Sequence, residues 1–287
     1  MEYIFQIENL SCAYQADQPV LRIPKLTLPR GRLIFVVGRS GVGKSTFIET
    51  LGLMNRTIVS EPQTSIRFAA TPSENVELKN HWQLGNAALS AFRRQYFSFV
   101  FQNTNLMPNF SSGENMMVSL LLQGRDIDTA RNHVMDMMKR LDLPERIFDA
   151  PIAKVSGGQR QRLAFVRAIT ADFHVLFGDE PTGNLDAATA INLMEALKAL
   201  LRERERTGIV VSHDLNLAFR FADVIVPLRK IIGPNGQEMG ETDNSILLLR
   251  GADQSTWHTL DGVSVADPAQ QLELLLRQPS TAPFLAS

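Results

Sequence analysis

The sequence predicts an α/β fold built on a largely parallel β-sheet whose strands are joined by crossover helices. Short runs of β-branched and aromatic residues alternate with stretches of helical periodicity along most of the chain, as such folds require. The chain has 287 residues, 44% hydrophobic and 21% charged, so it is long enough for one large α/β domain with an appendage. This composition is that of a globular protein and not of a disordered one.

The individual elements follow from the residue patterns. Buried-looking apolar runs predict strands at 33–37, 97–101, 175–178, 209–212 and 224–228. Apolar residues at helical spacing predict helices after Lys44 and at 129–141, 158–170 and 187–205. The polar stretch 55–90 is interpreted as an irregular or antiparallel insert. The stretch 103–155 has no candidate core strand and is interpreted as a helical subdomain.

The sequence changes character after about residue 230. "GPNGQEMG" (233–240) predicts a turn, "SILLLRG" (245–251) a strand and "DPAQQLELLLR" (267–277) a short helix. Residues 231–287 are therefore treated as a C-terminal extension of unknown role. Two alternatives for this extension are a regulatory or dimerising flap and a passive extra hairpin.

Charge and cysteine content bear on several classes of function. The 29 basic and 30 acidic residues give a net charge of −1, so the chain has no overall electrostatic footprint for nucleic acid. No apolar run reaches the roughly 18 residues that a membrane helix needs. The single cysteine, Cys12, agrees with a reducing compartment, and the acidic N-terminus is unlike a signal peptide. We therefore expect a cytoplasmic protein without a nucleic-acid partner.

A phosphate-binding loop is predicted at 38–46, where "GRSGVGKST" follows a buried-looking strand and precedes a helix. Its glycines free backbone N–H groups to surround nucleotide phosphates, Lys44 would reach the β- and γ-phosphate oxygens, and the Ser45 hydroxyl would bind Mg²⁺. The alternative is a tight strand-to-helix turn. The residues of this phosphate loop expected to bind ATP are Gly38, Arg39, Ser40, Gly41, Val42, Gly43, Lys44, Ser45 and Thr46.

Two carboxylates follow the strand predicted at 175–178. In "HVLFGDE" (174–180), Asp179 can hold the hydration shell of the metal ion, and Glu180 can orient and deprotonate an attacking water. The alternative for such a pair is a solvated turn or a helix cap.

A second anion site is predicted in "VSGGQRQR" (155–162). Ser156, Gly157, Gly158 and Gln159, here called the Ser-Gly-Gly-Gln turn, precede a predicted helix, and a helix N-terminus attracts anions. The two glycines leave the backbone open to a ligand. The phosphate loop already supplies a complete site for the phosphates of one nucleotide. The turn would therefore bind a different phosphate.

These motifs together resemble those of the ATP-binding-cassette (ABC) ATPases. "GRSGVGKST", "VSGGQRQR", "FGDEPTGNLD" and "VSHD" have the order and approximate spacing of that family over roughly residues 3–229. "VFQNTNLMP" and "DEPTGNLD" are most similar to the branch of macrolide exporters and lipoprotein-release systems. The resemblance implies a P-loop NTPase of ABC type at 1–230, with a mainly parallel core sheet, an antiparallel N-terminal β subdomain and an inserted helical subdomain at about 103–155.

The resemblance also implies roles for four residues outside the loop. Tyr14 would stack on the adenine, Gln102 would contact Mg²⁺ or the water, and His213 would contact the γ-phosphate. Their alternatives are a half-buried tyrosine, a polar residue at a strand end and a histidine with local partners. Asp186 would lie at a dimer interface, or could simply cap the helix that follows it.

Two copies of such ATPases face each other head to tail, so the Ser-Gly-Gly-Gln turn would bind the γ-phosphate of the partner's ATP. The resemblance therefore implies an ATP-hydrolysing subunit of an ABC transporter that drives a separate membrane permease. It would be peripheral on the inner face of the cell membrane, held there by the permease. The alternative is a regulatory ABC protein that signals to a membrane partner without transport; the transported substrate cannot be read from this chain.

The surface that would contact the membrane partner is predicted at 103–123. It follows Gln102 and contains apolar residues that would make a deformable surface, although methionine fills protein cores equally well. The residues considered for it are Met107, Phe110, Met116 and Met117.

Overall fold

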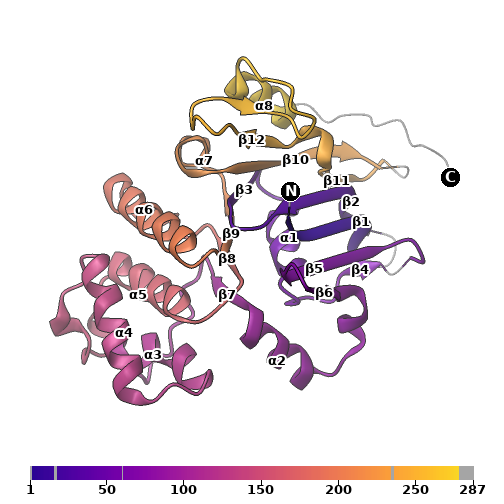
Figure 1. Ribbon diagram of the computed structural model, residues 1–287. Helices are drawn as coiled ribbons and strands as arrows, with labels where there is room; N and C mark the ends of the chain where they lie inside the picture. The colour runs from indigo at the N-terminus through magenta and orange to yellow at the C-terminus, as the bar shows by residue number, and fades with distance from the viewer. Residues whose placement is uncertain (1, 16–17, 60, 234–235, 278–287) are drawn as a thin grey trace. The chain divides into compact units, whose positions relative to one another are not determined.

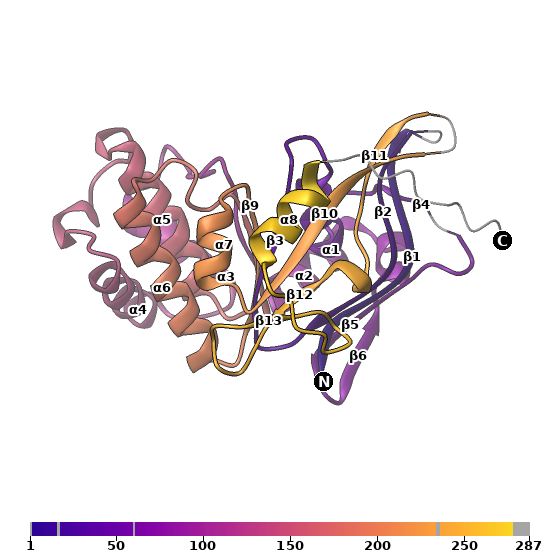
Figure 2. The same ribbon diagram turned by 90° about the horizontal axis from the view of Figure 1, so that it is seen from above.

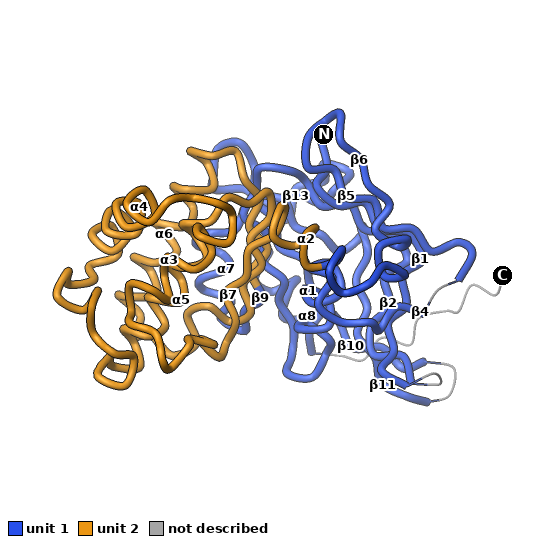
Figure 3. The backbone as a smooth tube through the Cα atoms, turned by 90° about the horizontal axis from the view of Figure 1, so that it is seen from below, with its two compact units in different colours: residues 1–89, 211–287 blue, residues 90–210 orange. Residues whose placement is uncertain are grey.

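The computed structural model describes residues 2–15, 18–59, 61–233 and 236–277 (Figure 1). It divides into two compact units (Figure 3). The first unit is Met1–Leu89 with Val211–Ser287, and the second unit is Ser90–Val210.

The first unit is built on a sheet whose neighbouring strands run in the order β6-β5-β1-β2-β11-β10-β3. The N-terminal strands pair antiparallel, whereas β11 pairs parallel with β2 and β10 pairs parallel with β3. Side chains such as Phe5 and Phe68, whose rings lie 5.3 Å apart, fill the core between strands. The strands are β1 (Tyr3–Gln15), β2 (Gln18–Pro29), β3 (Leu33–Gly38), β4 (Ile58–Val59), β5 (Ser65–Thr71), β6 (Glu74–Glu77), β10 (Val224–Ile232), β11 (Glu238–Glu241), β12 (Leu248–Arg250) and β13 (Trp257–His258).

Helices of the first unit connect and cover these strands. The α2 helix crosses the boundary between the two units. The helices are α1 (Lys44–Leu51), η1 (Leu78–Gln83), α2 (Asn86–Tyr96), α7 (Leu215–Phe221), η4 (Asn244–Ile246) and α8 (Pro268–Arg277).

The second unit combines parallel strands with a group of helices. Phe97 on β7 packs edge-to-face on Phe177 of the neighbouring β8 at 5.3 Å, which joins the two strands through their side chains. The strands are β7 (Phe97–Val100), β8 (Val175–Asp179) and β9 (Thr207–Ser212), which runs past the end of the unit. The helices are α3 (Ser112–Leu122), α4 (Ile127–Arg140), η2 (Glu145–Ile147), η3 (Ile152–Lys154), α5 (Gly157–Thr170) and α6 (Ala187–Glu203).

The architecture confirms the predicted strands and helices, the antiparallel insert and the absence of a strand between α3 and η3 in the second unit. The turn predicted at 233–240 is confirmed in its first part, where the Gly236 amide donates to the Gly233 carbonyl at 3.0 Å. Residues 238–240 belong to β11, and residues 234–235 lie outside the described residues. The apolar surface predicted on α3 was wrong. The methionines of α3 do not form a surface, because Met116 and Met117 are 0% and 8% exposed and pack in the core.

The C-terminal residues are part of the first unit's sheet. Strand β10 runs through residue 230, where the sequence placed a boundary, and β12 pairs antiparallel with β10 while β13 pairs with β12. Helix α8 packs against β10 (Figures 1 and 2). Arg250 fixes this arrangement, because its Nε donates to the Ala222 carbonyl at 2.6 Å and its guanidinium lies 4.5 Å from the centre of the Trp257 ring.

Candidate functional site

The phosphate loop of the first unit joins a fully buried strand to a helix. All six residues of β3 are buried, and the chain then turns through Gly43, whose φ of 94° is a left-handed conformation that favours glycine. Gly43 is the N-cap of α1, and no side chain of the described residues caps the helix there. A helix N-terminus without a side-chain cap is suited to bind an anion.

The ammonium group of Lys44 lies over this loop. Its side chain is only 8% exposed, and Nζ donates to the carbonyl oxygens of Gly38 at 3.0 Å and Arg39 at 2.9 Å. The cation is thus held in place before any nucleotide is present. Phosphate oxygens, which carry full negative charge, can replace these neutral carbonyl acceptors.

Tyr14 lies beside the phosphate loop. Its hydroxyl shares a hydrogen bond of 3.2 Å with the Thr46 hydroxyl, and its side chain is 61% exposed. An aromatic ring fixed at one end and open to solvent can stack on a flat base. The neighbouring Ser45 is exposed, whereas Thr46 is buried.

His213, also in the first unit, is exposed directly after β9. The next residue, Asp214, caps α7 by accepting hydrogen bonds from the amides of Asn216 at 2.9 Å and Leu217 at 3.1 Å. Its own amide donates to Ser212 Oγ at 3.0 Å. These contacts fix the backbone on both sides of His213 and hold the imidazole at the end of the strand.

The second unit brings Gln102 and the two carboxylates to one edge of its strands. Strands β7 and β8 are parallel, and their register pairs Val100 with Gly178. Gln102 and Glu180 each lie two residues further along, so both follow the carboxyl ends of adjacent parallel strands. Ligands of open α/β sheets bind at this edge. The side chains of Gln102 and Asp179 both offer oxygen atoms, the ligands that Mg²⁺ prefers.

Glu180 has an unusual backbone conformation. Its φ is 46°, which is uncommon for a residue with a side chain and costs conformational energy. The Gly183 amide donates to the Glu180 carbonyl at 3.1 Å, and Gln161 on α5 donates to the Pro181 carbonyl at 2.9 Å. These hydrogen bonds hold the backbone of the turn that carries Glu180.

Two residues that sequence reasoning missed hold the segment after Gln102. Arg167 on α5 donates to the carbonyls of Thr104 and Asn105, both at 2.9 Å, and burial lowers the pKa of this arginine. The fully buried Asn115 accepts from the Met107 amide at 2.7 Å and donates to the Met107 carbonyl at 3.0 Å. In the sequence, Arg167 is recognisable only as an arginine eight residues after Gln159. This spacing does not show that it contacts the segment after Gln102.

The Ser-Gly-Gly-Gln turn begins α5 with a capping box. Ser156 Oγ accepts from the Gln159 amide at 3.3 Å, and Gln159 Oε1 accepts from the Ser156 amide at 3.0 Å. A serine followed three residues later by glutamine is the sequence signal for this motif. Gly157 remains open, since a Cβ there would have no neighbour within 4 Å. The serine O–H can still donate to an anion.

Asp186 caps α6, which was one of its two predicted roles. Its carboxylate accepts from the Thr189 amide at 3.0 Å and from the Thr189 hydroxyl at 2.7 Å. These hydrogen bonds hold the pKa of Asp186 below its usual value.

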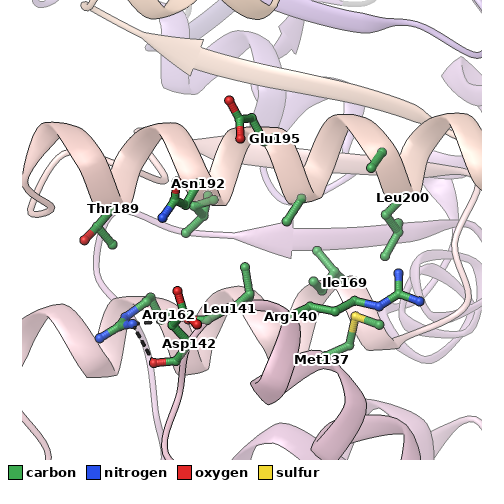
Figure 4. A pocket seen from close by; sticks show the side chains of 13 residues that line it. Met137, Arg140, Leu141, Asp142, Arg162, Ile169, Thr189, Asn192, Glu195 and Leu200 are labelled. Carbon is green, nitrogen blue, oxygen red and sulfur yellow. Dashed lines mark hydrogen bonds between the residues drawn. The ribbon is translucent and has the colours of Figure 1, made fainter.

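The second unit also has a cavity of about 530 Å³ between α6 and the helices α4 and α5 (Figure 4). Arg162 borders it and donates to the carbonyls of Leu141 and Asp142, both at 3.1 Å, at the end of α4. None of the residues predicted to bind the nucleotide lines this cavity. It is therefore separate from the candidate site.

Comparison with known proteins assigns the family. The family model described as "ABC transporter" matches residues 21–183. The chain belongs to the ABC transporter family. It is 34% identical over 221 residues to the lipoprotein-releasing system ATP-binding protein LolD of Geobacter metallireducens, which covers 76% of this chain and 92% of that protein. It is 35% identical over 199 residues to LolD of Myxococcus xanthus, covering 69% and 83%.

A larger relative and a solved structure agree with this ABC assignment. The macrolide export ATP-binding/permease protein MacB 1 of Yersinia pestis bv. Antiqua is 32% identical over 228 residues, which is 78% of this chain and only 33% of that protein. The dimeric structure of MJ0796, described as a bacterial ABC transporter cassette, aligns with a TM-score of 0.66 and 27% identity, covering 78% of this chain and 93% of the other. A second structure of MJ0796, with ADP and Pi, is in a post-hydrolysis state.

The ABC assignment confirms several predictions from the sequence. The fold is a P-loop NTPase fold of ABC type, and the chain is an ABC ATPase near the lipoprotein-release and macrolide-export branches. Within the ranges that the structure describes, no helix is long and apolar enough to cross a membrane.

Proposed function

We propose that this chain is the ATP-hydrolysing subunit of an ABC transporter and acts as a head-to-tail dimer on a separate membrane permease. One observation carries the proposal. The chain aligns with 92% of a LolD protein, named as an ATP-binding protein, but with only 33% of MacB 1, whose name includes a permease. This coverage supports an ATP-binding component, which would act on a membrane protein of another chain at the inner face of the membrane.

ATP would bind through the residues at the phosphate loop. The Gly38–Thr46 backbone amides and Lys44 would bind the phosphates, and the exposed ring of Tyr14 would stack on the adenine. The ammonium of Lys44 is already buried at the loop, where it donates to the carbonyls of Gly38 and Arg39, and phosphate oxygens would replace these acceptors. Because this side chain is already ordered in the folded protein, binding of nucleotide loses less conformational entropy.

Hydrolysis would use the polar residues at the strand ends. Glu180 would accept a proton from the attacking water, and His213 would contact the γ-phosphate. Mg²⁺, when bound, neutralises charge on the phosphates, and Ser45, Gln102 and Asp179 would hold it through oxygen atoms. The strained backbone of Glu180 supports this role, because such conformations persist where the surrounding structure fixes a functional side chain.

The Ser-Gly-Gly-Gln turn would bind the γ-phosphate of the partner's ATP. Ser156 and Gly157 are exposed, so their hydroxyl and amide groups are open to a second molecule. Dimers would form with ATP and separate when hydrolysis removes the terminal phosphate.

Light scattering of the Glu180→Gln variant tests this dimer. Glutamine keeps the shape of the side chain but cannot take the proton, so hydrolysis should fall by about 100- to 10,000-fold and ATP-bound dimers should accumulate. Adding Ser156→Arg should abolish the dimer, because a long cationic side chain fills the space for the γ-phosphate. Titration with fluorescent ATP should give similar monomer affinity for both variants.

Loss of monomer binding on adding Ser156→Arg would show that the turn acts within its own chain. ATP hydrolysis by Glu180→Gln above a few per cent of the parent rate would exclude Glu180 as the base, on the scale of about 100-fold expected for a general base.

The membrane partner would dock on the segment after Gln102, where Phe110 is 40% exposed. Arg167 and Asn115 hold this segment and would transmit its position to α3 and α5. The partner can be identified by co-purification from detergent-solubilised native membranes. Phe110→Glu should then lower partner-stimulated ATPase activity by about tenfold, in the range of an interface hot spot, and leave basal hydrolysis intact.

Ile127→Glu is the matched control, because Ile127 is a 65% exposed apolar residue of the same unit that lies at the start of α4, outside the segment 103–123. Equal loss of basal and stimulated activity in Phe110→Glu would contradict the docking proposal. ATP-driven release of a substrate from proteoliposomes that contain both proteins would establish transport and exclude a purely regulatory role.

A further inference from the structure

Strand β11 contacts the phosphate loop through its backbone. Gly240 lies in β11, and a Cβ atom built on it would be 1.9 Å from the Val42 carbonyl oxygen and 3.1 Å from the Val42 carbonyl carbon. Real side chains do not approach a carbonyl so closely. Gly240 does not have a left-handed φ, so the requirement for glycine at this position is one of space.

Two other strands enclose the same loop. A Cβ on Gly38 would be 2.8 Å from the Leu228 carbonyl oxygen of β10, and one on Gly43 would be 3.1 Å from the Val20 carbonyl oxygen of β2. Val42 itself is 3% exposed. The loop therefore rests on the backbones of β2, β10 and β11, and only β11 lies in the C-terminal part that the sequence left unassigned.

An ion-pair cluster fixes β11 between its neighbours. Glu241 is 2% exposed and accepts from Arg229 on β10 at 2.7 Å and from Arg22 on β2 at 3.3 Å. A buried carboxylate is stable only when it is paired in this way. Because Glu241 directly follows Gly240, the cluster sets the position of the backbone that touches Val42.

We propose that Gly240 is a positioning residue for nucleotide binding. The backbone of β11 holds the Val42 peptide, and through it the loop amides, in the conformation that accepts phosphates. This inference rests on the proposed role of the phosphate loop. It gives the segment after residue 230 a part in the nucleotide site.

The test is Gly240→Ala, with ADP as the ligand and calorimetry as the measurement. The added methyl must displace the Val42 carbonyl, so the Kd for ADP should rise on the order of tenfold, as for other small misplacements of binding groups. Hydrogen exchange should also become faster at the loop amides of the free protein. Gly85→Ala is the matched control, because a Cβ there meets nothing within 4 Å.

A measurement on the unchanged chain keeps the test decisive if Gly240→Ala does not fold. Coupling between two sites is reciprocal, so ADP should slow hydrogen exchange in β11 about fivefold or more relative to β6, which lies at the far edge of the same sheet. Equal protection of β11 and β6, or an unchanged Kd in a folded Gly240→Ala variant, would overturn the inference. Unchanged ADP binding in Lys44→Ala would instead contradict the nucleotide site itself.

Discussion

The phosphate loop and the Ser-Gly-Gly-Gln turn are both glycine-containing helix starts, but they satisfy their amides in opposite ways. The helix after the loop begins at Gly43, where no side chain of the described residues caps it, and a buried lysine lies nearby. The helix after the turn begins at Ser156, whose capping box with Gln159 satisfies two amides. The first helix start has no side-chain cap, which agrees with the proposal that it binds the phosphates of ATP. The second is capped by its own side chains and is exposed, which agrees with the proposal that it contacts a second molecule.

The largest effect on nucleotide binding is expected for Lys44→Ala. Removing the ammonium leaves the phosphates without their main countercharge, so nucleotide affinity should fall on the order of 100-fold or more and hydrolysis should be abolished. Calorimetry with ADP and a phosphate-release assay measure the two effects. Turnover close to that of the parent would show that the loop does not bind the phosphates.

A smaller effect is expected for Gly43→Ala. A left-handed conformation costs a residue with a side chain about 1–2 kcal/mol, and the new Cβ would lie 3.1 Å from the Val20 carbonyl oxygen. The Kd for ADP should rise on the order of tenfold, which corresponds to about 1.4 kcal/mol. Gly85→Ala again serves as control, and equal Kd values for the two variants would show that the conformation of Gly43 is not needed.

The smallest effect is expected for Ser156→Ala. Loss of the cap should lower the free energy of unfolding by about 1 kcal/mol, whereas Ser156→Gly should cost only a few tenths. Neither variant should change ADP binding by the monomer. Urea denaturation measures the first quantity and calorimetry the second. An altered ADP affinity in either variant would remove the contrast between the two helix starts.

Local patterns were sufficient to predict the strands and helix starts that carry the candidate site residues. The strand before the loop is recognised by its apolar run, and the helix start by its glycines. Both features are formed by residues that are close together in the sequence. The same holds for Asp186, whose capping bond reaches only Thr189. Four motifs in order then identified the family.

Contacts between distant residues were not predictable from the sequence. Met116 and Met117 satisfy a surface and a core equally well as a pattern, and only the packing of α3 against α5 decides that they are buried. The ion pair of Glu241 with Arg22 depends on two strands that meet only in the folded sheet. Gly240 contacts the Val42 carbonyl through its backbone, so no pattern of side chains in the sequence predicts the contact.

The distance along the chain between β2 and β11 has a consequence for biosynthesis. The Arg22–Glu241 pair joins residues 219 positions apart, and the phosphate loop leaves the ribosome long before β11 is made. At about 5–20 residues per second, the growing chain carries a loop without its supporting strand for on the order of 10 s or more. On the role proposed for β11, nucleotide should stabilise the finished cassette more than the nascent one. Fragments that terminate before β11 should bind ATP more weakly than the full chain.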